Sequence, residues 1–166
     1  MPIRQFYDRW PQYNRRLTEV VAVMTDEQLA IRPEPERWPI WATVAHTAAM
    51  RVYWLCGVLK EPGADGTPWP DLPDDGWEDH LDQPRSAGEL VWALESTWAV
   101  VDGVLDRWTP EILGEEVERV YGDTREVHTR SSILQRMLTH DAYHCGELSQ
   151  TLGIAGLPQI DLWRAD

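Results

Sequence analysis

The sequence predicts an all-α protein, an antiparallel four-helix bundle with long crossover loops and a small β-hairpin before the last helix. Four segments carry apolar residues at helical spacing, and most prolines and glycines fall between these segments. The length of 166 residues suits a single domain over residues 1–166, which is large enough to bury most of its apolar surface.

The first helix is predicted to run from about Pro11 to Met24. Pro11 either opens this helix or kinks one that begins near Pro2. Its apolar residues recur on one helix face: Tyr13, Leu17, Val20, Val21 and Met24. The following Thr25–Gln28 segment has the pattern of a capping box, so we expect a short extra helical turn there.

The second helix is predicted from Pro39 to about Leu59. It is apolar almost all round, with one polar stripe that consists of Thr43, Thr47 and Arg51. Neighbouring helices should therefore enclose it on most sides. The third helix opens with a capping box at Ser86–Glu89 and continues to Trp108.

The fourth helix is predicted to begin near Ser132, with Gln135 completing a capping box, and to end around Gly153. Before it, residues 117–128 alternate in polarity around the turn signal Gly122-Asp123, which favours a hairpin. Residues 61–85 form a long proline-rich linker, which is either a lid or binding loop or an ordered surface wrap.

Charge and composition exclude several function classes. The chain has 15 basic and 28 acidic residues and a formal net charge of −13, so it should repel nucleic acid and anionic lipid surfaces. No apolar run approaches the ~20 residues of a membrane span, and the first residues lack the apolar stretch of a signal peptide. Two cysteines make no disulfide framework, so we expect a cytoplasmic protein.

His140 and His144 are the first candidate metal ligands. Residues at i and i+4 of a helix lie on one face, so both imidazoles can reach one divalent ion. The alternative is one buried and one exposed histidine without a shared role. On the helical wheel the pair lies at the border of the apolar arc. His46, on the apolar second helix, is the candidate third ligand, although a lone histidine there is often only a hydrogen-bonded core residue.

Two segments resemble a known family. Arg37–His46 (RWPIWATVAH) is similar to the start of the second helix in the DinB/YfiT-like superfamily, and His140–Leu148 (HDAYHCGEL) to its last helix. The resemblance extends in element order over the whole chain. It implies a DinB-like four-helix bundle with right-handed crossings and one divalent metal ion, zinc or nickel, held by His46, His140 and His144. It also implies a homodimer, and some relatives are transferases or isomerases that use low-molecular-weight thiols.

Other polar residues are candidates for supporting roles. Glu147 lies close in helical phase to His140 and is a candidate general base, or else a surface glutamate. Asp141 falls near the centre of the apolar arc, where an unpaired carboxylate is costly. It either accepts the outer N–H of His46 and orients that ligand, or pairs with Arg51 or a tryptophan N–H.

The remaining candidates concern substrate binding. Arg51 and Arg136 are candidates to bind carboxylates of a thiol cosubstrate, unless they are solvated or ion-paired. His80 in the long linker is either a proton shuttle or an exposed loop histidine. Cys56 and Cys145 both fall in apolar arcs, which favours buried unreactive thiols, so a thiol nucleophile would have to come from a small molecule.

These features lead to two hypotheses. Three protein nitrogens leave a metal position open, which is typical of an enzyme. The expected reaction is a thiol-dependent transfer or isomerisation, or a hydrolysis, on a small-molecule substrate. The alternative is a non-catalytic metal- or ligand-binding bundle, such as a stress-related sensor. A His-Asp phosphohydrolase is disfavoured because only Asp161 follows the His140-Asp141 dyad within reach, and a ferritin-like site because the second helix has no carboxylate.

Overall fold

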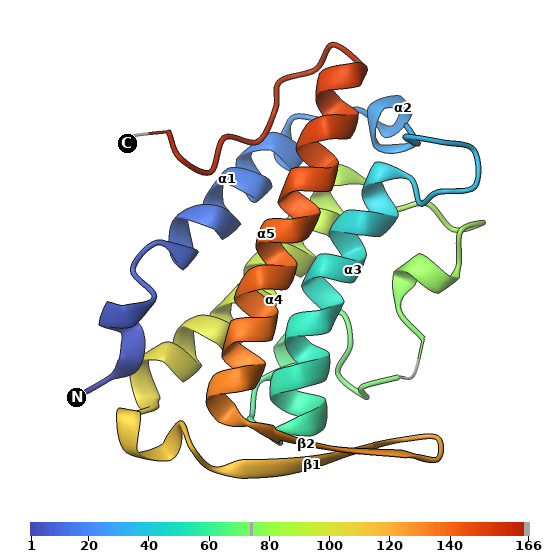
Figure 1. The fold of residues 1–166 in the computed structure, drawn as a ribbon. Coiled ribbons are helices and arrows are strands. Elements are labelled where there is room, and N and C mark those ends of the chain that lie inside the picture. Colours follow the sequence, from blue (N-terminus) through green and yellow to red (C-terminus); the bar gives the residue numbers. More distant parts are fainter. Residues whose placement is uncertain (74, 165–166) are drawn as a thin grey trace.

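The protein is described from a computed structural model, which covers residues 1–73 and 75–164. The fold is mostly helical with a two-stranded sheet (Figure 1), so the prediction of a helical chain with a small hairpin is confirmed. The long helices are α1 (Trp10–Ala22), α3 (Ile40–Val52), α4 (Ala87–Arg107) and α5 (Arg130–Ile154). Both α1 and α3 pack against α4 and α5.

Two of the predicted capping boxes are present. At α2 (Asp26–Leu29), Thr25 and Gln28 exchange side-chain and backbone hydrogen bonds, and Ser86 and Glu89 do the same at α4. The capping box predicted at Ser132 is wrong. The chain leaves the preceding strand in extended conformation at Thr129, and the Thr129 hydroxyl accepts the Ser132 N–H, so α5 begins earlier than predicted.

The direction of the helices explains the long linker. In Figure 1, α1 and α5 run up the page and α3 and α4 run down it. After α3, a π-helical segment (Tyr53–Val58) completes the predicted second helix. Because α4 begins at the end of the molecule where α3 also begins (Figure 1), the linker must travel back along α3 first. A short helical turn in this linker, Trp77–Asp79, packs against α3.

The hairpin consists of β1 (Glu116–Tyr121) and β2 (Thr124–Thr129), which are antiparallel. Gly122 has a φ of 56°, a left-handed conformation that favours glycine in the turn. The hairpin lies across the end of the helices where α5 begins (Figure 1). Its Arg119 donates to the Tyr53 hydroxyl at 2.7 Å, which ties the sheet to the π-helical segment.

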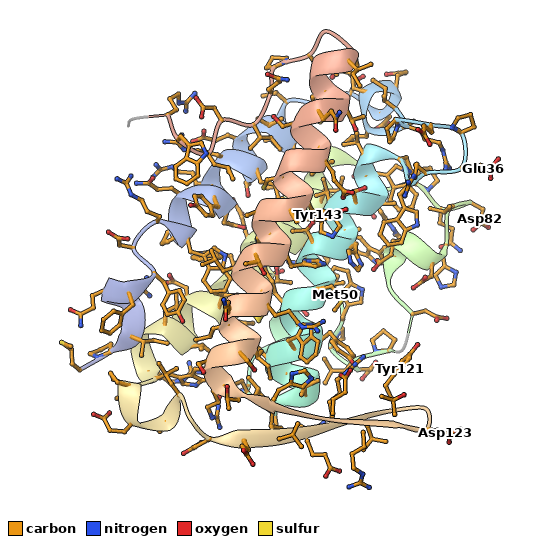
Figure 2. The ribbon with its side chains drawn as sticks, in the orientation of Figure 1. Glu36, Met50, Asp82, Tyr121, Asp123 and Tyr143 are labelled. Carbon is orange, nitrogen blue, oxygen red and sulfur yellow. The ribbon has the colours of Figure 1, made fainter. Side chains whose placement is uncertain are left out.

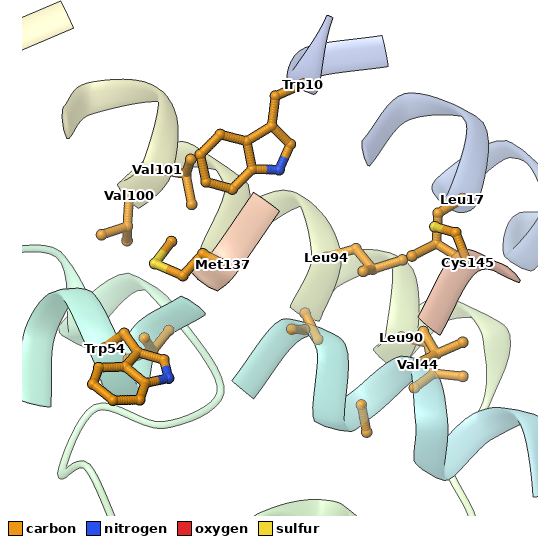
Figure 3. Close-up of a cluster of buried hydrophobic side chains, with 14 of the residues drawn as sticks. Trp10, Leu17, Val44, Trp54, Leu90, Leu94, Val100, Val101, Met137 and Cys145 are labelled. Carbon is orange, nitrogen blue, oxygen red and sulfur yellow. The ribbon is translucent and has the colours of Figure 1, made fainter. Parts of the chain in front are cut away.

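The apolar core lies between the long helices. Side chains from all four of them point into it, among them Leu17, Val44, Leu94 and Met137 (Figure 3). Among the described residues, no helix combines the length and the apolar character that crossing a membrane requires.

One ion pair is buried within this core. Arg51 on α3 and Asp141 on α5 are each 1% exposed, and Nη2 of the arginine lies 2.9 Å from Oδ2 of the aspartate. Arg51 also donates to Asn14 Oδ1 at 2.7 Å and to the Leu94 carbonyl at 3.3 Å. The Trp10 indole N–H donates to Asp141 at 2.8 Å. This polar cluster therefore joins α1, α3, α4 and α5.

Replacing one partner of this pair should destabilise the fold strongly. Arg51→Met leaves the Asp141 carboxylate buried without its cation, so we expect the free energy of unfolding to fall by about 3–5 kcal/mol in urea denaturation. The double variant Arg51→Met/Asp141→Leu should recover part of this loss. Arg125→Met removes an exposed pair with Glu118 and should cost no more than about 1 kcal/mol. Equal effects of the two single variants would contradict the structural role of the buried pair.

Candidate metal centre

The three histidines predicted as ligands meet between α3 and α5. Nε2 of His140 lies 3.0 Å from Nε2 of His46 and 3.1 Å from Nε2 of His144. One ring nitrogen from each histidine lies within 4.8 Å of the others. His46 and His140 are 94 residues apart in sequence. Imidazoles from two distant segments therefore surround one point.

Helical spacing on α5 and the packing of α3 against α5 bring the three imidazole rings together. His140 and His144 lie one turn apart on the same face of α5, with ring centroids 4.3 Å apart. His46 faces them from the middle of α3, and its ring centroid is 4.9 Å from that of His140. The Trp38 ring packs 5.0 Å from the His46 ring. The His46 ring is therefore held between an indole and a second imidazole.

Two carboxylates orient the outer nitrogens. Nδ1 of His46 lies 2.7 Å from Oε1 of Glu78, and Nδ1 of His144 lies 2.7 Å from Oε2 of Glu147. Because a carboxylate only accepts, each Nδ1 carries the hydrogen of its neutral ring. The Nε2 atoms of His46 and His144 then present lone pairs toward the same point.

This donor set fits a divalent cation. With neutral rings, the only hydrogen available among the three converging nitrogens is that of His140, which can serve one of its two short contacts. The second contact is then left without a hydrogen, and if the hydrogen of His140 is on its Nδ1, all three converging nitrogens present lone pairs, with Nε2 of His140 3.0–3.1 Å from the other two. Such an arrangement is repulsive unless a cation lies between the nitrogens. Three neutral imidazoles are a common ligand set for zinc and nickel.

The local environment keeps the two histidine rings on α5 neutral. Burial, together with the neighbouring His144 and His46, lowers the pKa of His140 to about 3. Burial also lowers the pKa of His144, although Glu147 acts in the opposite direction. A histidine must be unprotonated to bind a metal ion. Both histidines on α5 are therefore in the form that can bind a metal ion at neutral pH.

Glu78 was not predicted from the sequence. It lies in the linker turn Trp77–Asp79 and is 7% exposed. Its carboxylate folds back over Gly76, where an added Cβ would lie 2.2 Å from Glu78 Oε2, so glycine leaves the room that this carboxylate needs. The sequence offered one general indication, the long linker over residues 61–85, for which a binding loop was one of the interpretations.

Asp141 and Arg51 have structural partners. The carboxylate beside His46 Nδ1 is that of Glu78, whereas Asp141 pairs with Arg51 and Trp10. These are the alternative partners that the sequence left open for Asp141. Because the Arg51 guanidinium is engaged with Asp141, Asn14 and the Leu94 carbonyl inside the helical core, it is not free to bind a substrate carboxylate.

The other predicted residues lie around the cluster. Glu147 is beside His144, with its side chain 46% exposed. Arg136 is exposed and stacks on the Trp54 ring, with 4.9 Å between the guanidinium carbon and the ring centroid. His80 is exposed, follows the turn that carries Glu78 and is not among the three clustered ligands.

A cavity of about 550 Å³ adjoins the histidines. Its lining includes Trp38, Tyr143, His144 and Glu147, together with Pro33, Glu34, Glu36 and Arg37 from the segment before α3. In Figure 2, Tyr143 on α5 and Met50 on α3 mark the face of the molecule that carries the site, and Glu36 marks the segment before α3 that lines the cavity. A small molecule can therefore approach His144 from this side.

The two cysteines are free and buried. Burial raises the pKa of Cys145 to about 12 and also raises the pKa of Cys56. Thiols with raised pKa values are poor nucleophiles, because only the thiolate attacks. The structure thus agrees with the prediction of buried, unreactive thiols.

Comparison with known proteins shows the family to which the chain belongs. The model of the DinB superfamily matches residues 11–148, a range that includes all three clustered histidines. A solved structure, a DinB-like protein from Bacillus cereus ATCC 10987, has a TM-score of 0.71 and 18% sequence identity, with 96% of each chain covered. At this identity the likeness shows the fold. No curated protein matches the sequence significantly. Because the family model covers most of the chain, the protein belongs to the DinB superfamily.

Proposed function

We propose that this chain is a metal-dependent enzyme that binds one divalent ion, zinc or nickel, at His46, His140 and His144. The long helices would form the antiparallel four-helix bundle of the superfamily, with the site between α3 and α5. The substrate would be a small molecule, and the nucleophile a cytoplasmic low-molecular-weight thiol or water. The observation that supports this best is the convergence of three imidazole nitrogens with a single hydrogen to share.

An open coordination position favours catalysis over a purely structural ion. Among the described residues, the ligand group contains three histidines and no fourth histidine, cysteine or carboxylate. Structural zinc sites are usually closed by four protein ligands. When bound, a divalent ion supplies Lewis acidity, which lowers the pKa of a water or thiol that reaches it. The non-catalytic alternative would need another group to close the site.

The surrounding residues suit proton transfer. Glu147 lines the cavity while its Oε2 orients His144, so we assign to it the proton that the nucleophile loses. A hydrogen bond to Glu147 raises the pKa of Tyr143, which keeps that phenol protonated as a hydrogen-bond donor. Because Cys56 and Cys145 are buried, a thiol nucleophile has to be a second small molecule.

Removing any one ligand should abolish metal binding. His46→Ala, His140→Ala and His144→Ala should each lose stoichiometric zinc or nickel, measured by elemental analysis after dialysis. Helical content, measured by circular dichroism, should stay the same. His80→Ala is the matched control, because His80 is exposed and outside the cluster, and should keep the metal. Metal retained in all three ligand variants would contradict the assignment.

Glu78 should strengthen metal binding through His46. Glu78→Gln keeps the side-chain shape but removes the charge that orients the His46 N–H, so we expect about 10- to 100-fold weaker binding in competition with a chromophoric chelator. Glu147→Gln should weaken binding less, because its carboxylate is half exposed whereas Glu78 is buried. Glu95→Gln, an exposed change on α4, is the control. Unchanged affinity in Glu78→Gln would show that Glu78 has no such role.

Turnover should follow metal content. The chain is loaded with graded amounts of nickel or zinc and mixed with a small thiol and a chloronitroaromatic electrophile, and thiol loss is recorded. The rate above background should rise in proportion to bound metal and vanish in His144→Ala. Thiol loss that does not depend on the metal, across several electrophiles, would favour the non-catalytic alternative.

A further inference from the structure

An arginine lies on the same face of α5 as two of the histidines. Arg136 precedes His140 by one helical turn, and positions i and i+4 share a face. Its guanidinium lies over the Trp54 ring. Arg136, Trp54 and His140 line one small hollow together with Met50. Figure 2 labels Met50 on the face that carries the site. The positive charge is near enough to His140 to contribute to its lowered pKa.

Arg136 differs from its neighbours in having no anion. In the described part of the chain, no carboxylate lies within ion-pair distance of its guanidinium. Arg119 stacks on the same Trp54 ring but pairs with Glu126 at 2.9 Å, and Arg51 in the same hollow pairs with Asp141. Arg136 therefore presents an exposed guanidinium without an acidic partner beside one of the histidines.

Stacking on Trp54 prepares Arg136 for an external anion. An indole below the guanidinium plane restrains the side chain and leaves the N–H groups at its edge free. These N–H groups match the two oxygens of a carboxylate. Because Arg136 and His140 line the same small hollow, a short molecule whose carboxylate binds Arg136 could reach the histidines with its other end.

We propose that Arg136 binds the carboxylate of the small molecule whose other end reaches the metal ion. This inference rests on the proposed function and adds a substrate class to it, namely short anionic molecules. The cavity lined by Trp38, Tyr143 and His144 is separate from the hollow lined by Arg136 and His140 and would remain available for a second, less polar reactant.

Three thiols of nearly equal size test the proposal on the full chain loaded with cobalt(II). Mercaptopropionate, mercaptoethanol and cysteamine carry an anionic, a neutral and a cationic tail. Their dissociation constants are obtained from the absorption of the bound cobalt, at matched thiolate concentrations. We expect mercaptopropionate to bind about tenfold more tightly than mercaptoethanol, and cysteamine most weakly. In Arg136→Gln this preference should disappear while mercaptoethanol binding stays the same, and Arg136→Lys should keep part of it.

Arg9→Gln is the matched control, because it removes the same charge at an exposed position that precedes α1. A preference that persists in Arg136→Gln, or that falls equally in Arg9→Gln, would overturn the role of Arg136 and leave the proposed metal site intact. A chain that gives no cobalt spectrum would overturn the proposed function and this inference with it. The cobalt spectrum before thiol addition shows whether each variant keeps the folded site.

Discussion

The buried contact between Arg51 and Asp141 constrains both the packing of α3 against α5 and the geometry of the site. Asp141 lies between His140 and His144 on α5, and His46 precedes Arg51 on α3 by little more than one turn. Sliding one helix along the other would separate the buried charges, which is strongly unfavourable in a low-dielectric interior. The contact that stabilises the helical core therefore also fixes how far α3 is shifted along α5, and with it the position of His46 relative to His140 and His144.

A second constraint comes from chain topology. Because α3 and α4 run in the same direction (Figure 1), the chain has to travel back along α3 between them. That path passes His46, and the turn at Trp77–Asp79 places Glu78 on its Nδ1. The connection thus does more than join two helices, since it supplies a buried carboxylate that no residue of α3 provides. The length of this connection follows from the shared direction of α3 and α4. The carboxylate beside His46 comes from the single turn Trp77–Asp79 within it.

Local signals account for what the sequence could predict. The capping boxes at Thr25 and Ser86 and the face shared by His140 and His144 depend on residues within one helical turn. Glu78 could not be found this way, because 32 residues separate it from His46 and the linker has no periodicity to give its side chains a direction. For Asp141, its position on the helical wheel predicted that the carboxylate is buried, but it did not decide which residue pairs with that carboxylate. The choice between His46 and Arg51 depends on how two helices pack, and no local pattern contains that information.

The order of polar residues along α5 connects these constraints with the proposed chemistry. Arg136, His140, His144 and Glu147 follow one another at spacings of four, four and three residues, which keeps all of them on one face of the helix. A single stripe thus carries a cation, two neutral nitrogens and a carboxylate, in that order. A molecule lying along this stripe would meet the positive charge first, then the nitrogens that can hold a metal ion, and then a carboxylate able to take a proton. Because one rigid helix carries all four groups, their spacing is set by the helical repeat, and only His46 and Glu78 depend on the packing of other segments.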